Sequence, residues 1–192
     1  MTVLNILQFP DPKLRITAKP IVNFDEKLQI KIDDMFETMY NAKGIGLAGT
    51  QVDFHKSLLV TDVSHDKNQP HVLINPEILS TNGIIDSNEG CLSVPGFQDD
   101  VQRAENIIVK YLDREGASKE CEMSGLLAIC VQHEIDHLNG KVIMDRKVET
   151  TVRRTEEKIG RNQLVTIKKG DAVKVLKYKK VQNLLKQGWV IH

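Results

Sequence analysis

Residues 126–140 read LLAICVQHEIDHLNG, in which an apolar run leads directly into a cluster of titratable side chains. The run LLAICV is apolar on every side of a helix, which predicts a helix from about 126 to 139 that lies in the core and stops at Gly140. His133 and His137 lie four residues apart and therefore share one face of that helix. Burying two imidazoles and a glutamate costs free energy unless a partner compensates them.

The pattern H-E-x-x-H at residues 133–137 indicates a metal site. Both imidazoles can converge on one ion, while Glu134 reaches a water bound to that ion. Two ordinary surface histidines would give the same letters, but the apolar turn before them favours the metal. A catalytic ion usually has three protein ligands and one position left for water. A third ligand must therefore come from elsewhere in the chain.

Cys91 is the third ligand that the residues favour. It lies in EGCLSVPG, residues 89–96, whose glycines and proline specify a tight, irregular backbone that can bring a thiolate close to another element. Cys130 shares a helix face with His133 but lies about 10 Å along the axis from His137, too far to share one ion. We interpret Cys130 as a small apolar core residue.

Other H-E-x-x-H families complete the site differently. One uses a third histidine at the position where this chain has Ile143, so that arrangement fails. Another recruits a downstream carboxylate, for which Glu156 or Glu157 could serve, although they lie in a stretch typical of a charged, solvated helix at 149–159. That alternative predicts a metallo-endopeptidase. A further alternative is a ribosome-associated protein whose metal site is only structural.

Length and composition limit the class of protein. The 192 residues, 41% hydrophobic and 27% charged, fit a compact globular fold. No apolar run approaches the roughly 18 residues of a membrane span, and residues 1–12 lack a secretory signal. Three cysteines without a C-x-x-C pair argue against a disulfide framework. We therefore expect a cytoplasmic protein with no membrane partner.

The net charge of zero conceals an uneven distribution. Residues 161–192 carry eight basic side chains and one acidic one, so this tail has a charge of +7 and residues 1–160 have a charge of −7. A basic segment can bind phosphate groups or simply keep a surface solvated. The tail therefore needs an explanation separate from that of the rest of the chain.

The predicted elements indicate an α+β fold. An amphipathic helix is expected at 25–40, with Gly44 as its stop, packed against the H-E-x-x-H helix. Short, mostly antiparallel strands surround that central helix, and an extra β/α segment follows at the C-terminus. We expect a catalytic domain at 1–150 and an extension at 151–192. The expected strands cover residues 3–7, 57–63, 72–75, 107–113, 118–123, 164–167, 172–176 and 189–191, with a terminal helix at 180–187.

Residues 44–51, GIGLAGTQ, match the dinucleotide pattern G-x-G-x-x-G letter for letter. That function requires a strand before the glycines and a helix that begins on them. Here a predicted helix precedes them, so a nucleotide site is rejected. We interpret the glycines as residues that allow another backbone to approach, with the Gln51 amide beside its path.

GIGLAGTQ, EGCLSVPG and QHEIDHLNG, in this order, resemble the three signature motifs of peptide deformylase, over about residues 1–150. The resemblance implies hydrolysis of the formyl group from the N-formylmethionine of new polypeptides. It implies that Cys91, His133 and His137 bind one divalent metal ion, Fe²⁺ in the cell, with Zn²⁺, Ni²⁺ or Co²⁺ as substitutes. Glu134 then acts as the general base.

The same resemblance assigns the remaining roles. The Gln51 side chain and the Leu92 backbone N–H stabilise the oxyanion. Ribosome contact is also implied, to which the basic tail could contribute, and we expect a monomer. The chain departs from the family at Gly49, commonly alanine, and at Gln98, often arginine. The substrate-binding positions carried over are Gly46 and Gly90 for the peptide backbone and Ile45, Leu126, Ile129 and Cys130 for the methionine pocket.

Overall fold

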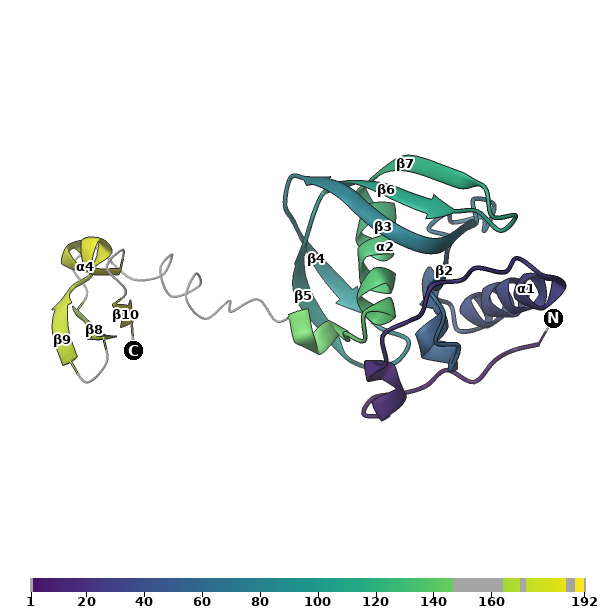
Figure 1. Ribbon diagram of the computed structural model, residues 1–192. Coiled ribbons are helices and arrows are strands. Elements are labelled where there is room, and N and C mark those ends of the chain that lie inside the picture. The colour runs from purple at the N-terminus through teal and green to yellow at the C-terminus, as the bar shows by residue number, and fades with distance from the viewer. Residues whose placement is uncertain (1, 147–163, 170–171, 186–188, 192) are drawn as a thin grey trace. The chain divides into compact units, whose positions relative to one another are not determined.

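The computed structural model describes residues 2–146, 164–169, 172–185 and 189–191 (Figure 1). The chain divides into two compact units, Met1–Lys147 and Val148–His192. The charged helix expected at 149–159, with Glu156 and Glu157, lies outside the described residues. Within the described parts, no helix is long and apolar enough to cross a membrane.

The first unit is built on a five-stranded antiparallel sheet in the order β1-β2-β3-β6-β7, so β1 and β7 form its edges. A second, two-stranded sheet pairs β4 with β5. Consecutive strands β6 and β7 form the hairpin that the sequence predicts. The strands are β1 Gly46–Ala48, β2 Leu58–Thr61, β3 His71–Asn82, β4 Ile85–Gly90, β5 Gln98–Arg103, β6 Asn106–Leu112 and β7 Ser118–Ser124.

The two helices of this unit, α1 (Glu26–Asn41) and α2 (Gly125–Leu138), pack into separate cores. Strand β2 shows why: Leu58 and Val60 contribute to the core with α1, whereas Leu59 contributes to the core with α2. Successive side chains of a strand point to opposite faces. The expectation that α1 packs against α2 is therefore wrong, because the sheet supplies a separate apolar face for each helix.

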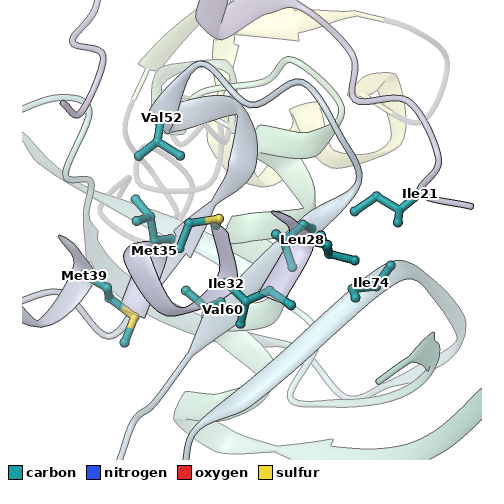
Figure 2. Close-up of a cluster of buried hydrophobic side chains, with 10 residues drawn as sticks. Ile21, Leu28, Ile32, Met35, Met39, Val52, Val60 and Ile74 are labelled. Carbon is teal, nitrogen blue, oxygen red and sulfur yellow. The ribbon is translucent and has the colours of Figure 1, made fainter. Parts of the chain in front are cut away.

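The start and the buried face of α1 follow from its sequence. The Asp25 carboxylate accepts a hydrogen bond from the Leu28 N–H at 3.0 Å and caps the helix. Ile32, Met35 and Met39 recur at helical spacing and are fully buried (Figure 2). The apolar stripe predicted for residues 25–40 is thus the face that α1 packs against the sheet.

The end of α1 differs from the prediction. Lys43, with a φ of 56°, takes the left-handed conformation that was expected of the glycine after it. The Lys43 N–H donates to the Tyr40 carbonyl at 3.1 Å, and the Gly44 N–H donates to the Met39 carbonyl at 2.9 Å. These two bonds form a Schellman motif. The left-handed residue of the turn that ends α1 is therefore Lys43, and Gly44 lies one position further along the chain.

One expected strand is absent from the structure, and two strands are present that were not expected. Residues 3–7 form no strand in the described sheets; the Leu4 N–H donates to the Thr38 hydroxyl at 2.9 Å and the Leu7 N–H to the Gln51 carbonyl at 2.8 Å, so separate partners replace a ladder. Strands β4 and β5 were not expected, because their sequences IDSNEG and QDDVQR are polar.

The second unit contains β8 (Leu164–Lys169), β9 (Ala172–Lys177), α4 (Tyr178–Leu185) and β10 (Val190–Ile191). The sheet order is β10-β8-β9. This succession of strand, strand, helix and strand confirms the order expected from the sequence, although the helix begins at Tyr178 instead of 180. A small core forms around Ile167, Val181, Leu176, Leu184 and Trp189.

Candidate active site

Cys91, His133 and His137 come together from two elements. Cys91 follows β4, and both histidines lie on the buried face of α2. The Cys91 Sγ lies 3.1 Å from the His137 Nε2, and one donor atom from each of the three residues lies within 4.8 Å of the others. The structure therefore brings the sequence-predicted ligand set into one group that could hold a metal ion.

The chemistry of this donor set fits a transition-metal ion. One thiolate and two imidazoles suit iron, zinc, nickel or cobalt, whereas magnesium and calcium prefer oxygen ligands. Metal–nitrogen and metal–sulfur bonds of about 2.0–2.3 Å require donor atoms that lie close together, as they do here. Three protein donors also leave a coordination position free for water.

A buried ion pair fixes the orientation of His133. Its Nδ1 lies 2.8 Å from the Glu89 Oε2, which leaves the Nε2 to face Cys91. Arg103 donates to both carboxylate oxygens of Glu89, from its Nε at 2.7 Å and its Nη2 at 2.8 Å. A carboxylate that binds the second nitrogen of a histidine fixes the tautomer and direction of the ring. Glu89 and Arg103 therefore position a candidate ligand.

The same arginine connects the hairpin to α2. The Arg103 Nη1 donates to the Asp136 Oδ2 at 2.6 Å, and Asp136 also accepts from the Arg146 Nε at 2.8 Å. Burial alone would raise the pKa values of Glu89 and Asp136, but the hydrogen bonds from the arginines outweigh it and hold both pKa values below the usual range. Both carboxylates are therefore charged at neutral pH.

Glu134 differs from Glu89 and Asp136, because no arginine in the described ranges of the chain pairs with its carboxylate. It is buried, and its Oε2 has no hydrogen-bond partner among the described residues. Burial raises the pKa of Glu134 to about 7. A Cβ atom on Gly46 would lie 2.5 Å from the Glu134 Oε1 and 2.6 Å from the Cys130 Sγ, so only glycine fits beside the carboxylate. A buried carboxylate with a free oxygen and a raised pKa is typical of a general base.

The two imidazoles have opposite electrostatic surroundings although they lie one helical turn apart. Burial disfavours the charged form of His133, but hydrogen bonds with Cys91 and Glu89 outweigh it and raise its pKa to about 10. Burial lowers the pKa of His137 to about 3, so this ring is neutral at pH 7. Opposite shifts on neighbouring titratable groups are characteristic of functional sites.

Gln51 lies beside the ligand group in a fixed orientation. Its Oε1 accepts from the Ala48 N–H at 2.8 Å, and its Nε2 donates to the Ser93 hydroxyl at 3.1 Å. The same Nε2 lies 3.8 Å from the Cys91 Sγ. The side chains of Gln51 and Ser93 are both buried. The amide nitrogen is therefore held beside the Cys91 sulfur.

A cavity of about 710 Å³ opens onto this group. Glu134, His133, Cys91 and Gln51 belong to its lining, whereas His137 is buried and does not. Leu126 is half exposed at the cavity, contrary to the expectation that the whole LLAICV run is buried. The lining includes every residue predicted for substrate binding: Ile45, Gly46, Gly90, Leu126, Ile129 and Cys130, together with Leu92.

Sequence reasoning missed four residues that hold the site together. Glu89 and Ser93 stood inside the quoted motif but received no role, and Asp136 stood between the two histidines. An acidic residue on a helix face that is otherwise buried signals a cationic partner. Arg103 gave no such signal, because nothing local marks it as the residue that meets Glu89 and Asp136.

Comparisons with known proteins agree with this geometry. The profile of the family described as Polypeptide deformylase matches residues 3–153. A peptide deformylase of Chromobacterium violaceum is 52% identical over 163 residues, covering 85% of this chain and 98% of that protein. A crystal structure of a peptide deformylase from Legionella pneumophila has a TM-score of 0.75 at 48% identity, covering 82% of this chain and 93% of the other.

An α+β fold around a buried H-E-x-x-H helix, with a cysteine and two histidines in one group, defines a metal-dependent hydrolase. Among these hydrolases, the chain belongs to the polypeptide deformylase family. Its reaction is the removal of the N-formyl group from nascent peptides.

Replacing Arg103 by leucine should destabilise the protein strongly. Arg103 is 4% exposed, and its loss would leave Glu89 and Asp136 buried without this partner, which typically costs about 3–5 kcal/mol. Urea denaturation measures the free energy of unfolding. Arg114→Leu is the matched control, since Arg114 pairs with Asp33 at the surface and its loss should cost about 1 kcal/mol or less. Equal losses for both variants would contradict the importance of the buried network.

Proposed function

We propose that Cys91, His133 and His137 hold one divalent ion in this deformylase, Fe²⁺ in the cell and Zn²⁺, Ni²⁺ or Co²⁺ as substitutes. The observation that carries the proposal is the 3.1 Å separation between the Cys91 Sγ and the His137 Nε2 on elements far apart in sequence. An ion held there supplies Lewis-acid chemistry by lowering the pKa of a coordinated water towards neutrality. The protein supplies the ligand set and its orientation, through Glu89 and Arg103.

Glu134 is the general base and then the general acid. It takes a proton from the attacking water, the oxygen of the water forms a bond to the formyl carbon, and Glu134 returns a proton to the departing amine as the carbon–nitrogen bond breaks. The products are formate and a free N-terminus. Its free Oε2, within the cavity lining, supports this role.

Gln51 and Leu92 stabilise the oxyanion of the tetrahedral intermediate, through the Gln51 side-chain amide and the Leu92 backbone N–H. Support for Gln51 comes from its fixed orientation: Ala48 and Ser93 hold the amide, so little reorganisation is needed during the reaction. Leu92 lies next to Cys91 and lines the same cavity.

The peptide substrate pairs as an added strand with Gly46 and Gly90, and its methionine side chain enters the pocket of Ile45, Leu126, Ile129 and Cys130. Strand β1 is an edge of its sheet, which leaves one side of its backbone available for pairing. A peptide deformylase from Acinetobacter baumannii, 33% identical with a TM-score of 0.72, has been solved with Met-Ala-Ser bound.

The partners follow from the substrate and from charge. Formylated chains appear at the ribosome, so we place the enzyme in the cytoplasm, as a monomer that contacts the ribosome transiently. A catalytic domain at 1–150 performs the reaction, and the extension at 151–192 contributes lysines. Lys174, Lys177, Lys179 and Lys180 are exposed, and such side chains can neutralise RNA phosphates.

Glu134→Gln should abolish turnover without removing the ion. The amide keeps the shape of the side chain but accepts a proton poorly, and loss of a general base typically lowers the rate by about 10²–10⁴-fold. Formate release from a formyl-Met peptide, with protein purified anaerobically, measures the rate, and metal analysis measures the ion. A variant that retains its rate would rule out this role for Glu134.

Cys91→Ser should lose the metal ion on dialysis, because a neutral hydroxyl is a poor substitute for a thiolate. Metal content per chain is the measurement. Glu156→Gln and Glu157→Gln are the controls and should retain the ion. The reverse result, with the ion lost in a glutamine variant and kept in Cys91→Ser, would support the carboxylate ligand of an endopeptidase-like site.

Deleting residues 161–192 should weaken binding to ribosomes in sedimentation assays over a salt series. Replacing the four exposed lysines 174, 177, 179 and 180 by glutamine should lower the dependence of log K on log salt by about 3, since each phosphate contact contributes about 0.7–0.9. Unchanged sedimentation of the deleted protein would rule out docking by the tail.

A further inference from the structure

Lys43 is the one exposed ionisable side chain among the residues that line the cavity. The wall to which it belongs runs from Gly46, buried beside Glu134, to Ile45, which is 42% exposed, and on to Lys43. Lys43 therefore lies at the end of the wall that is remote from the reaction centre. Glu89, another charged lining residue, is paired with Arg103 and cannot act as a free charge.

No ion pair in the described part of the chain includes the ammonium group of Lys43. Its backbone conformation, with a φ of 56°, is one that glycine adopts without steric cost and lysine does not. The Schellman bonds at Tyr40 and Met39 hold that conformation. The turn thus holds a lysine, with a free cation, at a position where glycine would be easier to accommodate.

We propose that Lys43 selects substrates by charge, favouring formylated chains with an acidic side chain at the third or fourth residue. This inference rests on the proposed pairing of the peptide with β1. A peptide that runs antiparallel to β1 with its methionine opposite Gly46 leaves the strand at Gly46 and continues towards the turn at Lys43. At about 3.3 Å per residue, its third and fourth residues lie about 7–10 Å beyond the methionine, on the side of Lys43.

The charge of the rest of the domain makes this cation consequential. Residues 1–160 have a net charge of −7, so the domain as a whole repels acidic peptides. The positive charge of Lys43 offsets that repulsion for the part of the peptide that passes nearest to Lys43. An exposed ion pair of this kind should change kcat/KM by about two- to fivefold, and the effect should shrink as salt is raised.

The test compares kcat/KM for formate release from formyl-Met-Ala-Ala-Glu-amide and formyl-Met-Ala-Ala-Lys-amide, and from the pair with the charged residue at the third position. The amide removes the charge of the C-terminus. Wild type should prefer the glutamate peptide in at least one pair. Lys43→Gln should remove the preference, and Lys43→Glu should reverse it. A ratio that is the same in wild type and Lys43→Glu at both positions would overturn the proposal.

Two variants separate charge from other effects. Lys43→Gly removes the ammonium while easing the backbone, so it should lose the preference with no loss of stability in thermal unfolding. If Lys43 served only to favour the C-terminal end of α1, Lys43→Gln would lower stability and leave the peptide ratio unchanged. Lys110 is an exposed lysine on β6 outside the cavity. Lys110→Glu makes the same change in net charge as Lys43→Glu and should leave the peptide ratio unaltered.

The outcomes also separate this inference from the function on which it rests. Failure of the wild-type protein to release formate from either peptide would count against the deformylase site itself. Release at equal rates from both peptides, in both pairs, would leave that site intact and remove the role of Lys43.

Discussion

The burial of charge in α2 is the constraint on which the structure depends. His133, Glu134 and His137 lie in a helix whose preceding turn is apolar, and each is less than one-tenth exposed. Taking such groups out of water is unfavourable unless partners replace the lost hydration. The hairpin of β4 and β5 provides partners for two buried groups of this helix, because Glu89 pairs with His133 and Arg103 pairs with Asp136. The catalytic helix and the hairpin are therefore energetically inseparable, although they lie far apart in the sequence.

The hairpin also explains why a polar segment is essential to the site. Its strands bury few apolar side chains, yet their complete pairing from Ile85↔Arg103 to Gly90↔Gln98 fixes where the Cys91 loop begins. One end of the hairpin delivers the thiol and the other delivers the arginine. The Cys91 sulfur is placed by backbone pairing and by one buried arginine, while the apolar cores of α1 and α2 lie on opposite faces of the five-stranded sheet.

The residues that line the cavity were easier to predict than the individual strands. The spacing of His133 and His137 and the glycines around Cys91 are local signals, and each residue expected at the substrate pocket lines the cavity beside Cys91. The helix stop at Lys43 and the strands β4 and β5 could not be predicted, because a left-handed lysine and polar strands contradict local propensity and are stabilised only by tertiary contacts. The role of Arg103 could not be predicted either, because its partners Glu89 and Asp136 lie 14 and 33 positions away in the sequence and no local pattern encodes such pairs.

The short edge strand β1 has a consequence for self-association. A free strand edge can template the addition of other chains, and long exposed edges lead to aggregation. The edge at β1 consists of Gly46–Ala48 only, and all three residues are buried. Such a recess is too short to start a growing intermolecular sheet, but it is long enough for the end of a single extended chain. A protein that works among unfolded polypeptides can thus keep an open edge without polymerising through it.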